Sequence, residues 1–274
     1  MDPISVMVNG IPGNVARTIA AGFLADPRFS LVPVSLTGPE IAETEREIDG
    51  IRIALIRPDD RGDLRDRIPE ATIAVDFTHP SAVNANAEFY CANGLPFVMG
   101  TTGGDRERLV RTVAAGPVPA VIAPNMAKPI VGFQSMMAYA AENFPGLFGG
   151  YALEIRESHQ AGKADTSGTA KAMVGIFNRL GCEFSEAEIE KERDPERQVR
   201  DWGVPPEHLG GHAWHTYALT SPDRTVRFAF THNINGRDIY VGGVLDAVAF
   251  LAARVGEHPG GRVYSMIDVL RSGG

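Results

Sequence analysis

The opening of the chain constrains its fold more than any other feature. Ile4, Val6 and Val8 recur at every second position of a short β-rich run that stops at Asn9-Gly10, and apolar side chains recur at helical spacing over 15–24. A glycine turn between a strand and a helix lets the backbone approach a pyrophosphate, and the helix N-terminus supplies N–H groups and a positive dipole. The opening therefore predicts the first unit of a dinucleotide-binding fold.

The glycine motif reads G-x-x-G-x-x-A, and on its own it is also compatible with an ordinary strand–helix turn. The following segments strengthen the prediction. Strands are expected at residues 31–36, 71–77, 96–99 and 118–122, and a helix at 81–93. Alternating strands and helices indicate a parallel, doubly wound sheet, in which ligands bind at the carboxyl ends of the strands. The turns expected to line the cofactor cleft are 78–80, 100–103 and 123–126.

The end of the second expected strand bears on the choice of cofactor. An NAD-selective site usually places an acidic residue there to hold the ribose 2′-hydroxyl, whereas this strand ends in Thr37-Gly38. A threonine can donate a hydrogen bond to a 2′-phosphate. The sequence therefore favours NADPH and leaves NADH open, because no arginine follows directly.

A histidine and a lysine share one glycine-containing loop in the middle of the chain. Residues 151–157 alternate as a strand, and apolar residues at helical spacing follow 166–169. His159 is suited to move a proton near neutral pH, and Lys163 adds a positive charge. The helix start can bind a carboxylate through N–H groups and hydroxyls. A solvated loop before a plain N-cap explains the same residues and stays open at this point.

Motifs along nearly the whole chain share one resemblance. Residues 157–169 (ESHQAGKADTSGT) follow the pattern E-x-H-H-x-x-K-x-D-x-P-S-G-T-A, apart from its second histidine and its proline. Further matching segments are VDFTHP (75–80), GTTG (100–103), APNM (123–126) and MIDVL (266–270). Together they resemble the dihydrodipicolinate reductases, a family of lysine-pathway enzymes. VMVNG, SHQA and GHAWHTY (211–217) are similar to the plant-type branch in particular.

The resemblance implies roles for individual residues. His159 would donate or accept the proton, and Lys163 would act near the ring nitrogen and a substrate carboxylate. The residues implied in substrate binding are Gln160, Lys163, Ser167, Gly168, Thr169 and Arg237. Those implied in cofactor binding are Gly10, Ile11, Pro12, Gly13, Asn14, Val15, Thr37, Phe77, Thr78, Gly100, Thr101, Thr102, Ala123, Pro124, Asn125 and Met126.

The implied reaction is hydride transfer from NADPH or NADH to the dehydrated ring of 4-hydroxy-tetrahydrodipicolinate, a small dicarboxylate, giving tetrahydrodipicolinate. Two departures weaken the match: Gln160 replaces a histidine and cannot carry charge, and Asn14 replaces a basic residue near the phosphates. Two alternatives stay open. One is a paralogous reductase of another cyclic imino acid, and the other is a catalytically silent nucleotide-binding regulator. The intact pair of His159 and Lys163 argues against the regulator.

Two other polar segments have simpler explanations. His208, His212 and His215 have a metal-like spacing, but residues 211–219 alternate as a strand, which places His212 and His215 on opposite faces. We therefore predict no metal site. The run at 186–200 carries charges of both signs at helical spacing, and a solvated helix or excursion is expected.

Charge and composition disfavour several classes of protein. The 26 Lys and Arg residues against 34 Asp and Glu residues give a net charge of −8, which disfavours binding to nucleic acid or anionic membranes. No apolar run approaches the ~18 residues of a membrane span. The N-terminus resembles neither a secretory signal nor a transit peptide, and the two cysteines lack a metal-type spacing. We therefore expect a cytoplasmic protein.

The expected architecture is α/β with two domains. A Rossmann-type dinucleotide-binding domain takes residues 1–126 plus 240–274, and an α+β substrate-binding and oligomerisation domain takes residues 127–239. The apolar run at 239–255 is expected as a helix that packs back on the first domain. The resemblance implies a homo-oligomer, either a tetramer or a dimer, that forms through the sheet of the second domain.

Overall fold

The computed structural model describes residues 2–255, 257 and 260–273. The chain divides into two units. The larger unit contains the chain up to Val131 and again from Asp238, and the inserted unit contains Gly132–Arg237. The expected α/β class with a Rossmann-type sheet is confirmed by the strand order of the larger unit.

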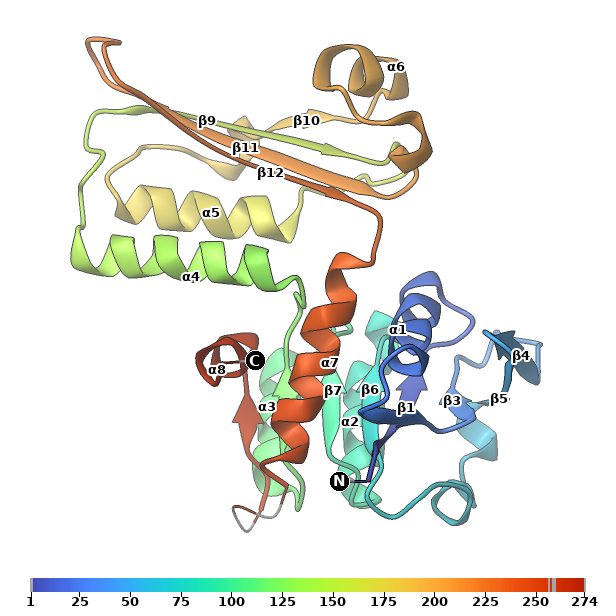
Figure 1. Cartoon of the computed structure of the whole chain (residues 1–274). Coiled ribbons are helices and arrows are strands. Elements are labelled where there is room, and N and C mark those ends of the chain that lie inside the picture. Colours follow the sequence, from blue (N-terminus) through green and yellow to red (C-terminus); the bar gives the residue numbers. More distant parts are fainter. Residues whose placement is uncertain (1, 256, 258–259, 274) are drawn as a thin grey trace. The chain divides into compact units, whose positions relative to one another are not determined.

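The larger unit is built on six parallel strands in the order β13-β8-β7-β6-β1-β2 (Figure 1). They are β1 (Ile4–Asn9), β2 (Phe29–Leu31), β6 (Ile73–Asp76), β7 (Phe97–Met99), β8 (Ala120–Ile122) and β13 (Val263–Tyr264). Every neighbouring pair is parallel. The carboxyl ends of all six strands therefore lie at one edge of the sheet, where ligands bind in folds of this class.

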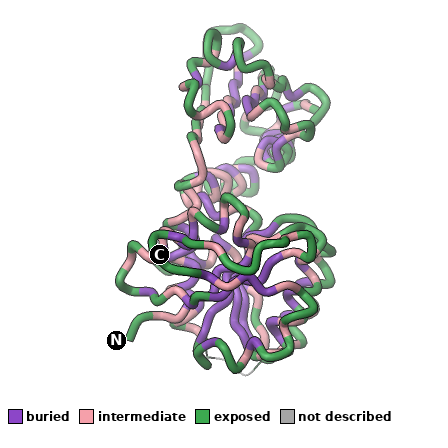
Figure 2. Tube along the Cα trace, turned by 90° about the vertical axis from the view of Figure 1, so that its right-hand side faces the viewer, coloured by how far each residue is buried: buried purple, intermediate pink, exposed green. Residues whose placement is uncertain are grey.

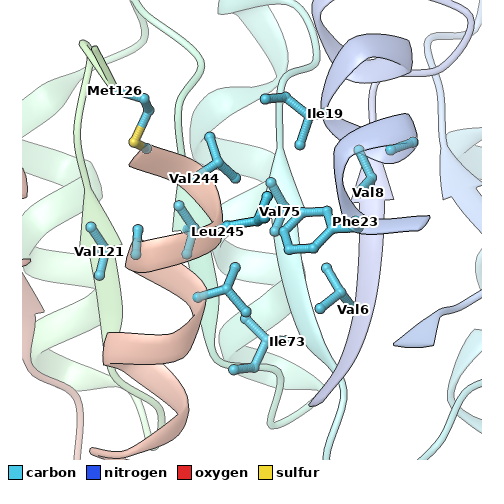
Figure 3. Packing of buried hydrophobic residues seen from close by; sticks show 14 of the residues in the cluster. Val6, Val8, Ile19, Phe23, Ile73, Val75, Val121, Met126, Val244 and Leu245 are labelled. Atoms are coloured by element: carbon cyan, nitrogen blue, oxygen red, sulfur yellow. The ribbon is translucent and has the colours of Figure 1, made fainter. Parts of the chain in front are cut away.

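Helices cover both faces of this sheet. They are α1 (Asn14–Leu24), α2 (Val83–Ala92), α3 (Arg106–Ala115), α7 (Ile239–Ala252) and α8 (Met266–Arg271). Successive strand residues point to opposite faces, so Val6 and Val8 pack against α1 and α7, whereas Met7 packs against α2 and α3. Figure 3 shows Ile19 and Phe23 of α1 in the first of these cores. Figure 2 shows buried residues running along the strands of this unit.

The segment expected as one strand at 31–36 is two strands. β2 ends at Leu31 and pairs with β1, whereas β3 (Val34–Leu36) pairs with β5 (Ile51–Ile56) and lies in a separate sheet that also contains β4 (Glu45–Ile48). Pro33 lies between the two strands and has no N–H for a ladder. Its carbonyl instead accepts a hydrogen bond from the backbone of Ala54 in β5. The prediction of a continuous strand is therefore wrong.

The inserted unit is a four-stranded sheet in the order β10-β9-β11-β12, and α4 and α5 lie on one face of it (Figure 1). Its elements are α4 (Lys128–Asn143, which begins in the larger unit), β9 (Ala152–His159), α5 (Gly168–Arg179), β10 (Glu190–Glu192), β11 (His212–Thr220) and β12 (Arg227–Asn235). Met173 and Phe177 of α5 pack on Ile155 and Tyr217 of the sheet. This core holds β9 and β11 in an antiparallel register that pairs Glu157 with His215.

In the inserted unit, one segment differs from expectation and another decides between two expected forms. β9 continues to His159, because the ladder with β11 extends that far, so this histidine ends a strand rather than lying in a loop. Of the two forms expected for the charged run at 186–200, the structure has the excursion and not one helix, because Pro195 begins a new turn within it. It contains a 3₁₀ turn (Glu186–Glu188), β10, the short helix α6 (Pro195–Arg197) and a π turn (Gln198–Trp202). Other 3₁₀ turns are Pro58–Asp60, Leu64–Arg67, Pro80–Ala82 and Pro206–His208.

The apolar run at 239–255 forms α7 and packs in the core of the larger unit, as expected. Its buried residues include Val244 and Val248, which contact the face of the sheet that α1 also covers. In the described part of the chain, no helix is both long enough and apolar enough to cross a membrane.

Candidate functional site

The glycine turn after β1 has a backbone geometry that only glycine accepts easily. Gly10 has a φ of +106°, and a Cβ atom there would collide with the carbonyl oxygen of Phe77. The N–H of Gly13 donates to the carbonyl of Gly10 at 2.8 Å, which closes the turn, and α1 begins at the next residue, Asn14. The turn therefore presents the N-terminus of α1 at the carboxyl edge of the sheet, as an anion-binding turn requires.

A buried carboxylate organises the neighbouring strand ends. Asp76, the last residue of β6, is fully buried and accepts hydrogen bonds from hydroxyls, an amide and a backbone N–H. Its donors are the Oγ1 and N–H of Thr78 (2.8 and 3.1 Å), Oγ1 of Thr101 (2.6 Å), Nδ2 of Asn86 (2.9 Å) and the hydroxyl of Tyr90 (2.6 Å). These bonds tie the turn after β6 to the turn after β7 and to α2. Burial raises the pKa of Tyr90 well above its usual value, so this hydroxyl remains a donor.

A cleft with a volume of about 770 Å³ opens beside these turns. Seven of the residues predicted to bind the cofactor line it: Gly10, Pro12, Gly13, Asn14, Thr37, Phe77 and Thr78. Ile11 is instead buried in the core, and Val15 packs against that core. The predicted residues that follow β7 and β8 (Gly100, Thr101, Thr102, Ala123, Pro124, Asn125 and Met126) do not line this cleft. The structure therefore places seven of the sixteen predicted cofactor-binding residues around one cleft.

The residues after β7 and β8 have structural contacts of their own. The N–H groups of Gly100 and Thr101 both donate to the carbonyl of Asp76, at 3.0 and 3.1 Å. A side chain at position 100 would collide with the ring of Phe77, so a small residue is required there. Met126 is buried in the core, and Thr102 is exposed.

Sequence analysis missed two charged residues in the cleft. Glu40 lines it, and its carboxylate lies against Gly38, so an acidic group stands near the tip of β3 after all. Arg61 lines the same cleft and donates to Oδ1 of Asn86 at 2.9 Å. The reading of this strand end as lacking a carboxylate is corrected, because the chain turns after Gly38 and returns Glu40 to it. Glu40 lies three residues after Thr37, outside the strand-end motif, so the motif could not indicate it.

The centre of the inserted unit is an ion pair between Glu157 and the half-buried Arg193. Glu157 is fully buried, and its second carboxylate oxygen accepts the N–H of Ser167 at 3.0 Å. The Arg193 guanidinium also donates to the carbonyl of Lys163 at 2.9 Å, which anchors the loop between β9 and α5. Arg193 was read as part of a solvated charged segment, and its position beside β9 was not foreseen.

His159 lies at the end of β9 with its ring against His215 of β11. The two Nε2 atoms are 3.4 Å apart, and both side chains are buried. His215 also packs against His232 of β12, with ring centroids 4.8 Å apart. Burial lowers the pKa of His159 to about 4, and the positive charges of Arg193 and Lys163 add to this effect. Burial likewise lowers the pKa of His215 well below its usual value, so both rings are neutral at pH 7.

The predicted substrate-binding residues differ in their exposure and in their contacts. Nζ of Lys163 pairs with Asp165 at 2.7 Å, and the lysine side chain is about one-fifth exposed. Ser167 caps α5 by accepting the N–H of Thr169 at 3.2 Å, so that N–H is already bonded within the chain. Gly168 is exposed at the helix start, and Gln160 is half-buried in the turn before Lys163. A Cβ atom at Gly211 would lie 3.5 Å from the guanidinium of Arg237, which places this arginine beside the start of β11.

The metal-like histidine spacing does not converge on one point. Nε2 of His212 bonds to the hydroxyl of Ser158 at 2.8 Å, whereas His215 faces His159. In the described part of the chain, one group of three could offer ligand atoms to an ion, with the atoms of Glu157, His159 and His215 within 4.8 Å of one another. The guanidinium of Arg193 beside the same carboxylate disfavours a further cation, and we assign no metal to this group.

The similarity of this chain to known proteins extends over nearly its whole length. Family models described as the N-terminus and the C-terminus of dihydrodipicolinate reductase match residues 4–126 and 130–270. A chloroplastic 4-hydroxy-tetrahydrodipicolinate reductase of Arabidopsis thaliana is 47% identical over 98% of this chain and 78% of its own length. A reductase of the same activity from Rubrobacter xylanophilus is 31% identical over 98% of this chain and 99% of its own length. The expected likeness to the plant-type branch is confirmed.

Solved structures support the fold. A dihydrodipicolinate reductase of Paenisporosarcina sp. with bound dipicolinate has a TM-score of 0.67 at 17% identity, covering 96% of this chain and 97% of its own. A DAP dehydrogenase of C. glutamicum in complex with DAP has a TM-score of 0.53 at 13% identity, with coverages of 98% and 94%.

The comparisons also correct the expected location. Four plant relatives that are 44–47% identical to this chain are named as chloroplastic proteins. The expectation of a cytoplasmic protein is therefore wrong, because these relatives carry a chloroplastic location in their names.

Proposed function

The chain belongs to the dihydrodipicolinate reductase family, and we propose that it reduces 4-hydroxy-tetrahydrodipicolinate to tetrahydrodipicolinate with NADPH or NADH in lysine and diaminopimelate biosynthesis. After water is lost, the ring takes up a hydride on carbon and a proton, and the dinucleotide leaves oxidised. The dinucleotide-binding domain of residues 1–126 plus 240–274 would hold the cofactor. The domain of residues 127–239 would hold the substrate.

The observation that carries this proposal is the group of His159 and Lys163 beside the start of α5. A neutral imidazole and an ammonium lie within one turn of each other, next to a helix N-terminus. Such a group suits a substrate with two carboxylates and a ring that must be protonated. His159 would move the proton, while Lys163 would bind a carboxylate after exchanging its contact with Asp165.

The remaining predicted substrate residues would hold the second carboxylate. Gly168 is exposed at the first position of α5, where a backbone N–H can bind an anion. Ser167, Thr169 and Gln160 would add hydrogen bonds, and Arg237 would add a positive charge. The bond from Thr169 to Ser167 would have to be exchanged for one to the substrate.

The cofactor proposal is NADPH with NADH accepted. Thr37 and Arg61 line the cleft and could donate to a 2′-phosphate, whereas the carboxylate of Glu40 favours a ribose hydroxyl. Replacing Glu40 with Gln removes a repulsive charge and is expected to raise the ratio of kcat/KM for NADPH over NADH about tenfold, or ~1.4 kcal/mol. The two cofactors would be compared in steady-state assays, and an unchanged ratio would show that Glu40 does not read the ribose.

We also propose that the chain assembles as a homotetramer or a homodimer through the sheet of the inserted unit. β12 is an edge strand of this sheet, and Phe228 on it is 43% exposed. An exposed apolar edge strand favours pairing with another chain. Light scattering after size-exclusion chromatography would test the assembly, and a Phe228→Glu variant should shift the mass towards the monomer. A wild-type monomer at micromolar concentration would rule the assembly out.

The assay that tests the function supplies the substrate in situ from pyruvate and aspartate semialdehyde and follows oxidation of NADPH and NADH. We expect turnover with at least one cofactor, and a large loss of turnover for Lys163→Ala. Absence of turnover with both cofactors would exclude the proposed reaction. Turnover that Lys163→Ala leaves unchanged would exclude the site but not the reaction.

A further inference from the structure

The ring of His159 has one side-chain hydrogen-bond partner in the described part of the chain, and this partner comes from a different strand. His215 lies on β11, 56 residues along the chain, and its Nε2 is 3.4 Å from Nε2 of His159. The antiparallel register of β9 and β11 places His215 directly opposite Glu157. His215 is 2% exposed, so water cannot replace this contact.

The surroundings of the two rings indicate which of them donates. Nε2 of His215 lies 3.8 Å from a carboxylate oxygen of Glu157, and a negative charge favours a hydrogen on that nitrogen. A neutral imidazole carries one N–H. If Nε2 of His159 accepts from His215, the N–H of His159 is left on Nδ1.

We infer that His215 is a positioning residue for the reaction proposed above: it donates from Nε2 to Nε2 of His159 and thereby fixes the orientation and tautomer of that ring. The inference rests on the proposed function for its catalytic meaning. Glu157 and His159 both lie near Nε2 of His215, so the carboxylate favours a hydrogen on that nitrogen and His159 accepts it.

The neighbouring His232 provides a matched control. Its ring packs on His215, as a second buried imidazole whose pKa burial lowers to about 4. Its Nε2 lies 3.5 Å from the hydroxyl of Tyr217 and has no hydrogen bond to His159. Replacing His232 with Phe therefore perturbs the packing of the same cluster and leaves the bond between the Nε2 atoms in place.

Kinetics of three variants test the inference. His215→Phe removes the donor and is expected to lower kcat on the order of 100-fold, with the substrate KM changed less than about threefold. His215→Gln retains an N–H donor and should recover most of that loss. His232→Phe should stay within about threefold of the wild type. Equal losses in His215→Phe and His215→Gln, or an equal loss in His232→Phe, would overturn the inference.

Nitrogen chemical shifts of the histidine rings provide a readout that does not depend on turnover. In the wild type, the His159 ring should carry its hydrogen on Nδ1, and in His215→Phe the ring should become a mixture of tautomers. An identical His159 tautomer in both proteins would overturn the inference even if the enzyme is active. Stoichiometric zinc in the purified wild type that is lost from His215→Phe would also overturn it, because His215 would then be a metal ligand. Failure of the wild type to turn over would contradict the proposed function alone.

Discussion

The two units hold their candidate ligand-binding groups by different means. In the larger unit, the turn at Gly10 and the hydrogen bonds of Asp76 with neutral donors shape a cleft out of backbone. In the inserted unit, the largely buried pair of Glu157 and Arg193 and the neutral rings beside it form the site. Under the proposed function, backbone geometry would govern cofactor binding, and a few ionisable side chains would govern the chemistry. Removal of one charged side chain in the inserted unit is therefore expected to lower the free energy of unfolding more than a change in the turn at Gly10 of the larger unit.

The largest effect on stability is expected from Glu157→Gln. This change leaves the half-buried Arg193 guanidinium without its counter-charge, and the loss of a largely buried pair in this way costs up to about 3 kcal/mol. Urea unfolding at pH 7 measures the free energy of unfolding. Glu186→Gln is the control, because the contact of Glu186 with Lys171 is 3.6 Å long and solvent-exposed and should be worth less than about 0.5 kcal/mol. Similar values for the two variants would remove the distinction between the buried and the exposed pair.

The next effect tests the larger unit. Gly10→Ala is expected to cost about 2 kcal/mol and to weaken NADPH binding at least about tenfold, because the new Cβ atom pushes the turn away from Phe77. Gly50→Ala introduces a comparable positive φ with nothing within 4 Å, so it should cost about 1 kcal/mol and leave binding unchanged. Titration calorimetry and urea unfolding measure both quantities. Equal NADPH affinities in the two variants would show that the turn does not bind the pyrophosphate.

The smallest effect concerns pH. Burial lowers the pKa of both His159 and His232 to about 4, whereas an unfolded histidine has a pKa near 6.5. Between these values the unfolded chain binds more protons than the folded chain, so stability falls as the pH drops from about 6.5 to about 4 and is level above that window. His232→Phe removes one such group and should flatten the fall. Urea midpoints at pH 5 and pH 7.5 measure it, and an equal slope in both proteins would contradict the burial of His232 as its cause.

Local patterns in the sequence were sufficient for much of the larger unit. The strand, turn and helix around Gly10 are set by neighbouring residues, and the strands that end at Asp76 and Met99 are short apolar runs between turns. The error at 31–36 is also local in origin, because Pro33 was present in the sequence and its missing N–H was not weighed. Glu40 was not predicted, because the turn that brings its carboxylate back to Gly38 leaves no sign in the residues of the strand end itself.

The site in the inserted unit depends on register over long sequence separations. His159 and Lys163 could be identified from one loop, but the partner of His159 lies 56 residues away and Arg193 lies 36 residues from Glu157. Alternation along β11 correctly placed His212 and His215 on opposite faces. It could not show which face meets Glu157, because that depends on the pairing of β9 with β11. A charged residue such as Arg193 looks solvated until its buried partner is known.

The central claim is that the inserted unit carries the proton chemistry while the larger unit carries cofactor binding. It is tested most directly by measuring kcat and the Kd for NADPH on one variant, His159→Gln. We expect kcat to fall between about 10²-fold and 10⁴-fold, as loss of an acid–base group does, while the Kd for NADPH stays within about twofold of the wild type. A variant that keeps its kcat, or one that loses NADPH affinity in proportion to its activity, would contradict the claim.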